Sequence, residues 1–154
     1  MYCWYESLAC LRIQDKLIPY LQDIDTPAHT AAIAYSHPEH IACAFSTPSA
    51  TFASEPPAGQ LRIASQATAN FTANLISSVA KMVSSSMFST GGDELNTICY
   101  AQDNQTQSEL QSSGRTLDQA LSDFILAEHA GLRKLGKTPV VKAGGLPWYQ
   151  FSNS

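Results

Sequence analysis

The sequence predicts an α/β fold built around a parallel sheet or barrel. Segments typical of strands and of helices alternate along the 154 residues, in the order strand, loop, helix, strand, loop, helix, strand. The length suits a single domain. A hydrophobic content of 44% is ordinary for a globular chain and argues against wholesale disorder.

The first half of the chain contributes one strand, one long loop and one helix to this prediction. Residues 21–25 alternate apolar and polar side chains and end at Thr26-Pro27, which predicts a strand. Residues 36–60 are rich in proline and predict a long loop. Residues 65–82 carry apolar side chains at helical spacing, and Ser65 is suited to cap that helix.

The second half repeats the alternation. Residues 87–92 predict a strand that runs into a pair of glycines, and the Gln/Ser/Asn-rich residues 101–115 predict a loop. Thr116 and Gln119 form a capping-box pattern at the start of a helix that Gly136 ends. Residues 138–141 predict a short buried strand. One face of the expected helix is apolar: Leu117, Ala120, Leu121, Phe124, Ile125 and Leu132.

Charge and hydropathy exclude several classes of partner. Charged residues make up only 14%, the net charge is −4, and the chain has no basic stripe that could neutralise phosphates. We therefore expect no nucleic-acid partner. No apolar run approaches the roughly 18 residues of a membrane span, so we expect no membrane partner either.

Several features bear on the secretory route. Asn70 and Asn104 each begin an Asn-x-Thr sequon, although one or two such sequons arise by chance in a Ser/Thr-rich chain. Residues 1–21 show no signal-peptide pattern. The four cysteines allow three pairings if all are oxidised, and buried free thiols are an equal alternative. They are Cys3, Cys10, Cys43 and Cys99, and their spacing is not that of a zinc site.

The chemistry concentrates after the second expected strand. Asp93 and Glu94 are adjacent carboxylates that follow a glycine pair, which could kink the chain and turn both toward one cleft. Clefts at the carboxyl ends of parallel strands usually hold the active sites of α/β folds. A solvated turn is the simpler alternative. Asp25 and His29 form a second cluster after the first strand, and a metal held by these four residues is a weaker possibility, since their spacing is not diagnostic.

Two motifs give the sequence a resemblance to a known family. Residues 88–97, Phe-Ser-Thr-Gly-Gly-Asp-Glu-Leu-Asn-Thr, resemble the signature of the family 20 glycoside hydrolases, the β-N-acetylhexosaminidases. Residues 24–30 resemble that family's Asp-x-Pro-Gly-His segment, residues 36–43 and 55–62 look like its fungal branch, and residues 136–141 look like its next strand. The resemblance implies a partial TIM (β/α)8 barrel over residues 22–141, with about three βα units corresponding to strands 3 to 5. Residues 1–21 and 142–154 look divergent.

The resemblance also implies a reaction. Family members remove terminal N-acetylhexosamine residues by a retaining mechanism in which the 2-acetamido group of the substrate is the nucleophile. Glu94 would be the general acid and base, Asp93 would hold the acetamido group, and His29, with Asp25 nearby, would support the acid. Cys43 and Cys99 match positions that look disulfide-bonded in fungal relatives. No cofactor and no metal are implied.

The expected substrates are oligosaccharides that end in N-acetylglucosamine or N-acetylgalactosamine, including chitin oligomers. The intact family enzyme would be secreted or vacuolar/lysosomal, and it would form a homodimer in some members. Two departures favour an alternative, a catalytically inactive truncated fragment. Ala28 replaces the family glycine, which would strain a positive φ, and the Trp-Glu segment expected after Val141 is replaced by a divergent tail.

Overall fold

The computed structural model describes residues 21–92 and 94–142. Three parallel strands form a small sheet in the order β1-β4-β5. They are β1 (Gln22–Thr26), β4 (Met87–Gly91) and β5 (Thr138–Val140), which confirms the three expected strands and their parallel direction. The divergent ends that the sequence predicts, and Asp93, lie outside the described residues apart from Leu21 and Lys142.

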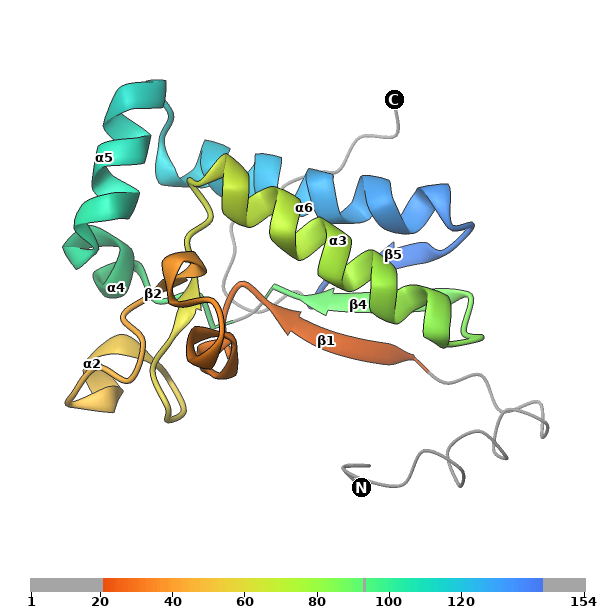
Figure 1. Cartoon of the computed structure of the whole chain (residues 1–154), viewed down its shortest axis with the longest axis horizontal. Helices are drawn as coiled ribbons and strands as arrows, with labels where there is room; N and C mark the ends of the chain where they lie inside the picture. Colours follow the sequence, from red (N-terminus) through yellow and green to blue (C-terminus); the bar gives the residue numbers. More distant parts are fainter. Residues whose placement is uncertain (1–20, 93, 143–154) are drawn as a thin grey trace.

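Two long helices lie side by side against the sheet (Figure 1). They are α3 (Gln66–Met82) and α6 (Leu117–Lys134). The expected N-cap of α3 is confirmed, because the Ser65 hydroxyl accepts a hydrogen bond from the backbone N–H of Thr68. The capping box at Thr116 and Gln119 is confirmed as well. Between helices and sheet lies a buried apolar cluster of Ile76, Ala80, Phe88 and Leu132.

The expected loop over residues 36–60 is only partly correct, because it contains short elements around a core of its own. Its apolar residues are buried under α4 and α6 and so give the segment a fixed shape. β2 and β3 pair antiparallel, with Ile41 opposite Leu61. After η2 (Ala31–Tyr35), which precedes this segment, the elements are η3 (Pro38–His40), β2 (Ile41–Ala42), α2 (Ser49–Phe52) and β3 (Gln60–Leu61).

The prediction of a loop over residues 101–115 is wrong. This region forms α4 (Thr97–Gln102) and α5 (Asn104–Ser113). The polar composition concealed these helices, since α5 buries little besides Thr106. Its ends are nevertheless well capped: the Asp103 carboxylate accepts from the N–H of Thr106, and Gly114 has a left-handed φ of 66°. Local capping therefore stabilises a helix without a strong apolar stripe.

No helix within residues 21–92 and 94–142 combines the length and the apolar character needed to cross a membrane.

Candidate active site

The residues that follow β1 and β4 meet at one edge of the sheet. The parallel pairing places Thr26 opposite Gly91, so the segments after these two residues leave the sheet next to each other. There the Nε2 atom of His29 lies 2.8 Å from the Oε2 atom of Glu94. The two side chains are 31% and 37% exposed, so the pair is accessible to a ligand from solvent. The structure thus brings together two of the predicted site residues that are 65 positions apart in the sequence.

Both members of this pair have a strained backbone. His29 and Glu94 each have a φ of 59°, in the left-handed region that residues with a Cβ rarely occupy. Such conformations cost about 1–3 kcal/mol and cluster at functional sites. The sequence predicts a strained positive φ at Ala28, where the family has glycine. Ala28 does not have a positive φ, and the strained backbone is at the next residue, His29.

The glycine pair turns the chain as the sequence predicts. Gly91 and Gly92 have φ values of 70° and 103°, which favour glycine. A Cβ atom on Gly91 would lie only 2.9 Å from the Cα atom of Asp25. Glycine at this position therefore allows β4 to approach β1 closely just before Glu94.

A depression opens beside the His29–Glu94 pair. Its far wall comes from the segment between α2 and β3, so the folded long loop forms part of the site. The lining residues are Ala28, His29, Phe52, Ala53, Ser54, Glu55, Pro57, Gly59, Gln60 and Glu94.

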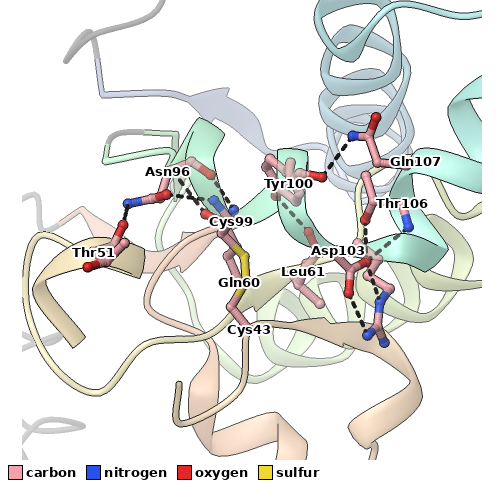
Figure 2. The surroundings of a disulfide bond; sticks show 11 residues. Cys43, Thr51, Gln60, Leu61, Asn96, Cys99, Tyr100, Asp103, Thr106 and Gln107 are labelled. Carbon is pink, nitrogen blue, oxygen red and sulfur yellow. Dashed lines mark hydrogen bonds and ion pairs between the residues drawn. A yellow bond between two sulfur atoms is a disulfide. The ribbon is translucent and has the colours of Figure 1, made fainter. Parts of the chain in front are cut away.

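The long loop is fastened to α4, the helix that follows Glu94 (Figure 2). A disulfide joins Cys43 to Cys99, whose Cα atoms are 6.0 Å apart. Beside it, the Gln60 side-chain amide donates to the carbonyl of Asn96 at 2.8 Å. The wall of the depression and the segment that carries Glu94 are therefore held by the same contacts.

Asp25 has a partner that the sequence did not indicate. Its Oδ1 atom lies 2.8 Å from Nζ of Lys142, which also lies 2.9 Å from a carboxylate oxygen of Asp23. Hydrogen bonds from Lys142 to Asp25 and Asp23 raise the pKa of the ammonium well above its usual value. The backbone N–H of Lys142 also donates to the carbonyl of Gly91. Asp25 thus links β1 to the end of β5.

A buried polar network lies beneath the carboxyl edge of the sheet, and sequence reasoning missed it. The hydroxyl of Thr26 lies 2.9 Å from the carbonyl of Thr90 and 3.1 Å from Oε2 of Glu128. A hydroxyl donates one proton, so if Thr26 donates to Thr90, a protonated Glu128 donates to Thr26. Burial raises the pKa of Glu128 to about 8, which fits the neutral acid. Burial likewise lowers the pKa of the adjacent His129 to about 4.

A sequence signal for this network existed. Glu128 falls among Leu121, Ile125 and Leu132 at the spacing of the apolar stripe, where a carboxyl group is unusual. Its side chain is fully buried, and its Oε1 atom has no hydrogen-bond partner. An ionisable residue on the buried face of a helix points to a specific polar contact, here with the ends of β1 and β4.

The two sequons lie on helices. Asn70 is exposed on α3, and Asn104 is the exposed first residue of α5. The threonine of each sequon, Thr72 and Thr106, is fully buried. Both asparagine side chains are therefore accessible, and glycosylation stays a prediction.

Polar side chains that meet at the carboxyl edge of a parallel sheet are typical of the active sites of α/β enzymes, and comparison with known proteins gives the class as a glycoside hydrolase catalytic domain. The family described as "Glycosyl hydrolase family 20, catalytic domain" matches residues 14–146. The chain belongs to this family. It is 34% identical over 121 residues to a β-hexosaminidase of Arthroderma benhamiae, an alignment that covers 77% of this chain and 20% of that one. The chain thus spans about a fifth of that relative's length.

Solved structures show the same fold. An exo-β-N-acetylglucosaminidase of Vibrio harveyi, crystallised with N-acetylglucosamine, superposes with a TM-score of 0.63 at 20% identity, covering 83% of this chain and 20% of that one. A chitobiase of Flavobacterium johnsoniae gives 0.60 at 19% identity, over 79% and 18%. Family 20 catalytic domains are TIM barrels, and the three parallel strands described here form part of such an architecture.

Proposed function

We propose that this chain carries the acid–base centre of a β-N-acetylhexosaminidase. The observation that supports it most directly is the 2.8 Å contact between His29 and Glu94, both strained, at the carboxyl edge of the sheet. Since the chain spans a fifth of its curated relative, the activity, substrates and partners of the whole protein are part of this proposal.

The proposed reaction has two steps. Glu94 donates a proton to the glycosidic oxygen while the 2-acetamido oxygen of the substrate attacks the anomeric carbon, and the bond to the leaving group breaks. This step gives an oxazolinium ion and a Glu94 carboxylate. The carboxylate then takes a proton from water, which opens the oxazolinium ring with retention. We assign to Asp93, outside the described residues, the task of orienting the acetamido group and stabilising its positive charge.

His29 is a positioning residue in this scheme. In this scheme the Nε2 N–H of His29 donates to Oε2 of Glu94, so the acidic proton of Glu94 is on its other oxygen and passes from there to the glycosidic oxygen. After the first step, His29 donates to the Glu94 carboxylate and keeps it directed at the depression. Gln60 and the Cys43–Cys99 disulfide support the site indirectly. They hold in place the wall of the depression that lies opposite Glu94.

The remaining parts of the proposal follow from family membership. The three strands would be strands 3 to 5 of the barrel, within residues 22–141. The substrates would be oligosaccharides, including chitin oligomers, that end in N-acetylglucosamine or N-acetylgalactosamine, and the whole enzyme would be a secreted or vacuolar glycoprotein. The alternative is a family member without activity, favoured by Lys142 where the family has its Trp-Glu segment.

Release of nitrophenol from 4-nitrophenyl N-acetyl-β-D-glucosaminide by the purified chain tests the proposal. We expect turnover that falls about 10²–10⁴-fold in Glu94→Gln and less in His29→Asn, since asparagine tolerates the left-handed backbone. Asp118→Asn, an exposed carboxylate on α6, is the matched control. Turnover that survives Glu94→Gln contradicts the role of Glu94. A folded chain without turnover supports the inactive alternative.

A further inference from the structure

A second cluster of metal-ligating side chains lies on η3, away from the His29–Glu94 pair. His37, Glu39 and His40 each offer one ligand atom, and these three atoms lie within 4.8 Å of one another. The Nδ1 atom of His37 lies 3.2 Å from Oε1 of Glu39, and the Nε2 atom of His40 lies 3.9 Å from the same oxygen. The proposed glycosidase reaction uses none of these groups.

The two imidazoles lie close together although His37 is outside the helix, as an N-cap with φ −137° and ψ 63°. η3 begins at Pro38, with His37 as its N-cap and His40 as its last residue. Their ring centroids are 5.9 Å apart. The ring of Phe71 on α3 packs against both, at 4.9 Å from His37 and 4.4 Å from His40. A common aromatic platform therefore holds both rings.

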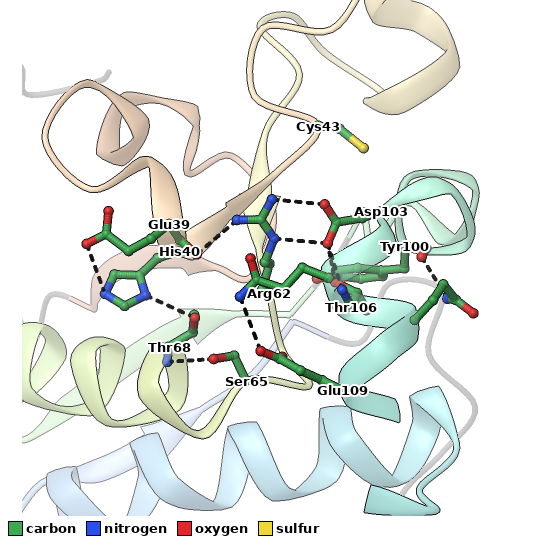
Figure 3. A network of polar contacts seen from close by, with 12 residues as sticks. Glu39, His40, Cys43, Arg62, Ser65, Thr68, Tyr100, Asp103, Thr106 and Glu109 are labelled. Carbon is green, nitrogen blue, oxygen red and sulfur yellow. Dashed lines mark hydrogen bonds and ion pairs between the residues drawn. The ribbon is translucent and has the colours of Figure 1, made fainter. Parts of the chain in front are cut away.

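The second nitrogen of His40 has its own partner. Its Nδ1 atom lies 3.0 Å from the hydroxyl of Thr68 (Figure 3). When this nitrogen carries the proton, the lone pair of Nε2 is directed toward Glu39. Metal-bound histidines characteristically use their other ring nitrogen in such a hydrogen bond, which fixes the tautomer and the ring orientation.

The backbone of η3 is fixed by a partly buried ion pair. Arg62 donates to the carbonyls of Pro38 and Glu39 at 3.2 and 2.9 Å. The same guanidinium is held by both oxygens of Asp103, each at 2.9 Å (Figure 3). Because Asp103 balances the charge of Arg62, the guanidinium leaves the Glu39 carboxylate available to a cation.

We propose that His37, Glu39 and His40 bind a divalent transition-metal ion, for which zinc is the natural probe. Two imidazoles and a carboxylate suit zinc, whose bonds of about 2.0–2.1 Å place tetrahedral ligand atoms roughly 3.3 Å apart. The 3.2 Å contact between Glu39 and His37 matches that spacing, and the 3.9 Å contact between Glu39 and His40 would have to shorten by roughly 0.6 Å. Water would complete the coordination, since the side chains of His37 and Glu39 are 46% and 59% exposed. The ion would tie η3 to α3 through the His40–Thr68 contact.

Calorimetric titration with zinc chloride, on untagged chain with Cys3→Ser and Cys10→Ser to remove thiols outside the described residues, tests the site. We expect one saturable site and affinity at least tenfold weaker in both His37→Gln and His40→Gln. The matched control is His29→Asn, which removes a similarly exposed histidine and leaves zinc affinity unchanged.

A spectroscopic readout separates metal ligation from general charge effects. Cobalt bound at the site gives the visible absorption of a histidine-ligated tetrahedral ion. We expect His37→Gln to abolish this absorption. Because His37 is the more exposed of the two histidines, the circular dichroism of the variant should stay that of the parent chain. Zinc affinity that is unaffected by His37→Gln and His40→Gln, or that is lost instead in His29→Asn, overturns the proposal. So does the absence of saturable binding.

Discussion

Gln60 and Asn96 are joined by a pair of reciprocal hydrogen bonds. The Gln60 amide donates to the Asn96 carbonyl at 2.8 Å, and the Asn96 backbone N–H donates to Oε1 of Gln60 at 3.1 Å. The Asn96 side chain caps α4 through the N–H of Cys99 and also donates to the carbonyl of Thr51. Two residues after Glu94, the chain is thus tied to the loop that lines the depression.

Truncation of either partner should loosen this junction. Gln60→Ala leaves the backbone groups of Asn96 without partners and should cost about 1–3 kcal/mol of unfolding free energy. Asn96→Ala removes the cap and should cost about 1 kcal/mol. Asn96→Asp retains an acceptor for Cys99 but loses the donor to Thr51, so its cost reports that second contact without the cap. Urea unfolding measures these differences, and equal stability of Gln60→Ala and the parent chain contradicts the prediction.

The Cys43–Cys99 disulfide should contribute strongly to stability. Its sequence separation is 56 residues, for which loop-closure entropy gives about 4 kcal/mol. We expect the double variant Cys43→Ala/Cys99→Ala to unfold at lower guanidinium concentration than the parent. Dithiothreitol should lower the parent midpoint and leave the double variant unchanged. A midpoint in the double variant equal to that of the oxidised parent excludes this contribution.

The Arg62–Asp103 pair should make stability sensitive to acid. Burial alone would raise the pKa of Asp103, but hydrogen bonds from Arg62 and Thr106 outweigh it and hold the pKa below the usual 3.8. Because the folded pKa is depressed, the stabilisation is present above about pH 4 and is lost as pH falls through the folded value.

We expect Asp103→Asn to cost about 2 kcal/mol at pH 7, where the carboxylate is charged, and less at pH 3. Arg62→Lys keeps the charge but loses the two-pronged contact, so it should fall between the parent and Asp103→Asn. Unfolding curves at the two pH values give the comparison. A cost for Asp103→Asn that is the same at both values is incompatible with this assignment.

Glu128 should make the protein less stable at alkaline pH. Its folded pKa of about 8 lies above the ordinary value of 4.5, so between these values the folded state binds more protons and stability falls as pH rises. His129, whose pKa is lowered from 6.5 to about 4, opposes this trend only below pH 6.5. Between pH 6.5 and 8 the Glu128 effect therefore acts without that opposition.

Glu128→Gln, which cannot ionise and still donates to Thr26, should remove the decline. We expect the parent to lose about 2 kcal/mol from pH 6.5 to 8 and the variant to stay nearly level. Asp118→Asn on the same helix should behave like the parent. Guanidinium titrations at the two pH values measure this, and an unchanged slope in Glu128→Gln assigns the decline to another group.

Local rules were sufficient for much of the fold. The capping residues Ser65 and Thr116 act within a single helical turn, so their helices could be predicted without knowledge of the tertiary structure. The same reasoning failed for α5, where capping by Asp103 and Gly114 outweighed a composition typical of loops. Composition is a weak guide when a helix is stabilised mainly at its ends.

The sequence by itself determined where the candidate chemistry lies, because the glycine pair before Glu94 and the motif around His29 are contiguous in the chain. Only the tertiary structure decided which groups meet. The register of β1 against β4 brings His29 to Glu94, and β5 brings Lys142 to Asp25. Partners so far apart in sequence are selected by strand pairing and burial, which no local pattern encodes. The same packing places Glu128 beneath the carboxyl edge of the sheet, where burial raises its pKa to about 8.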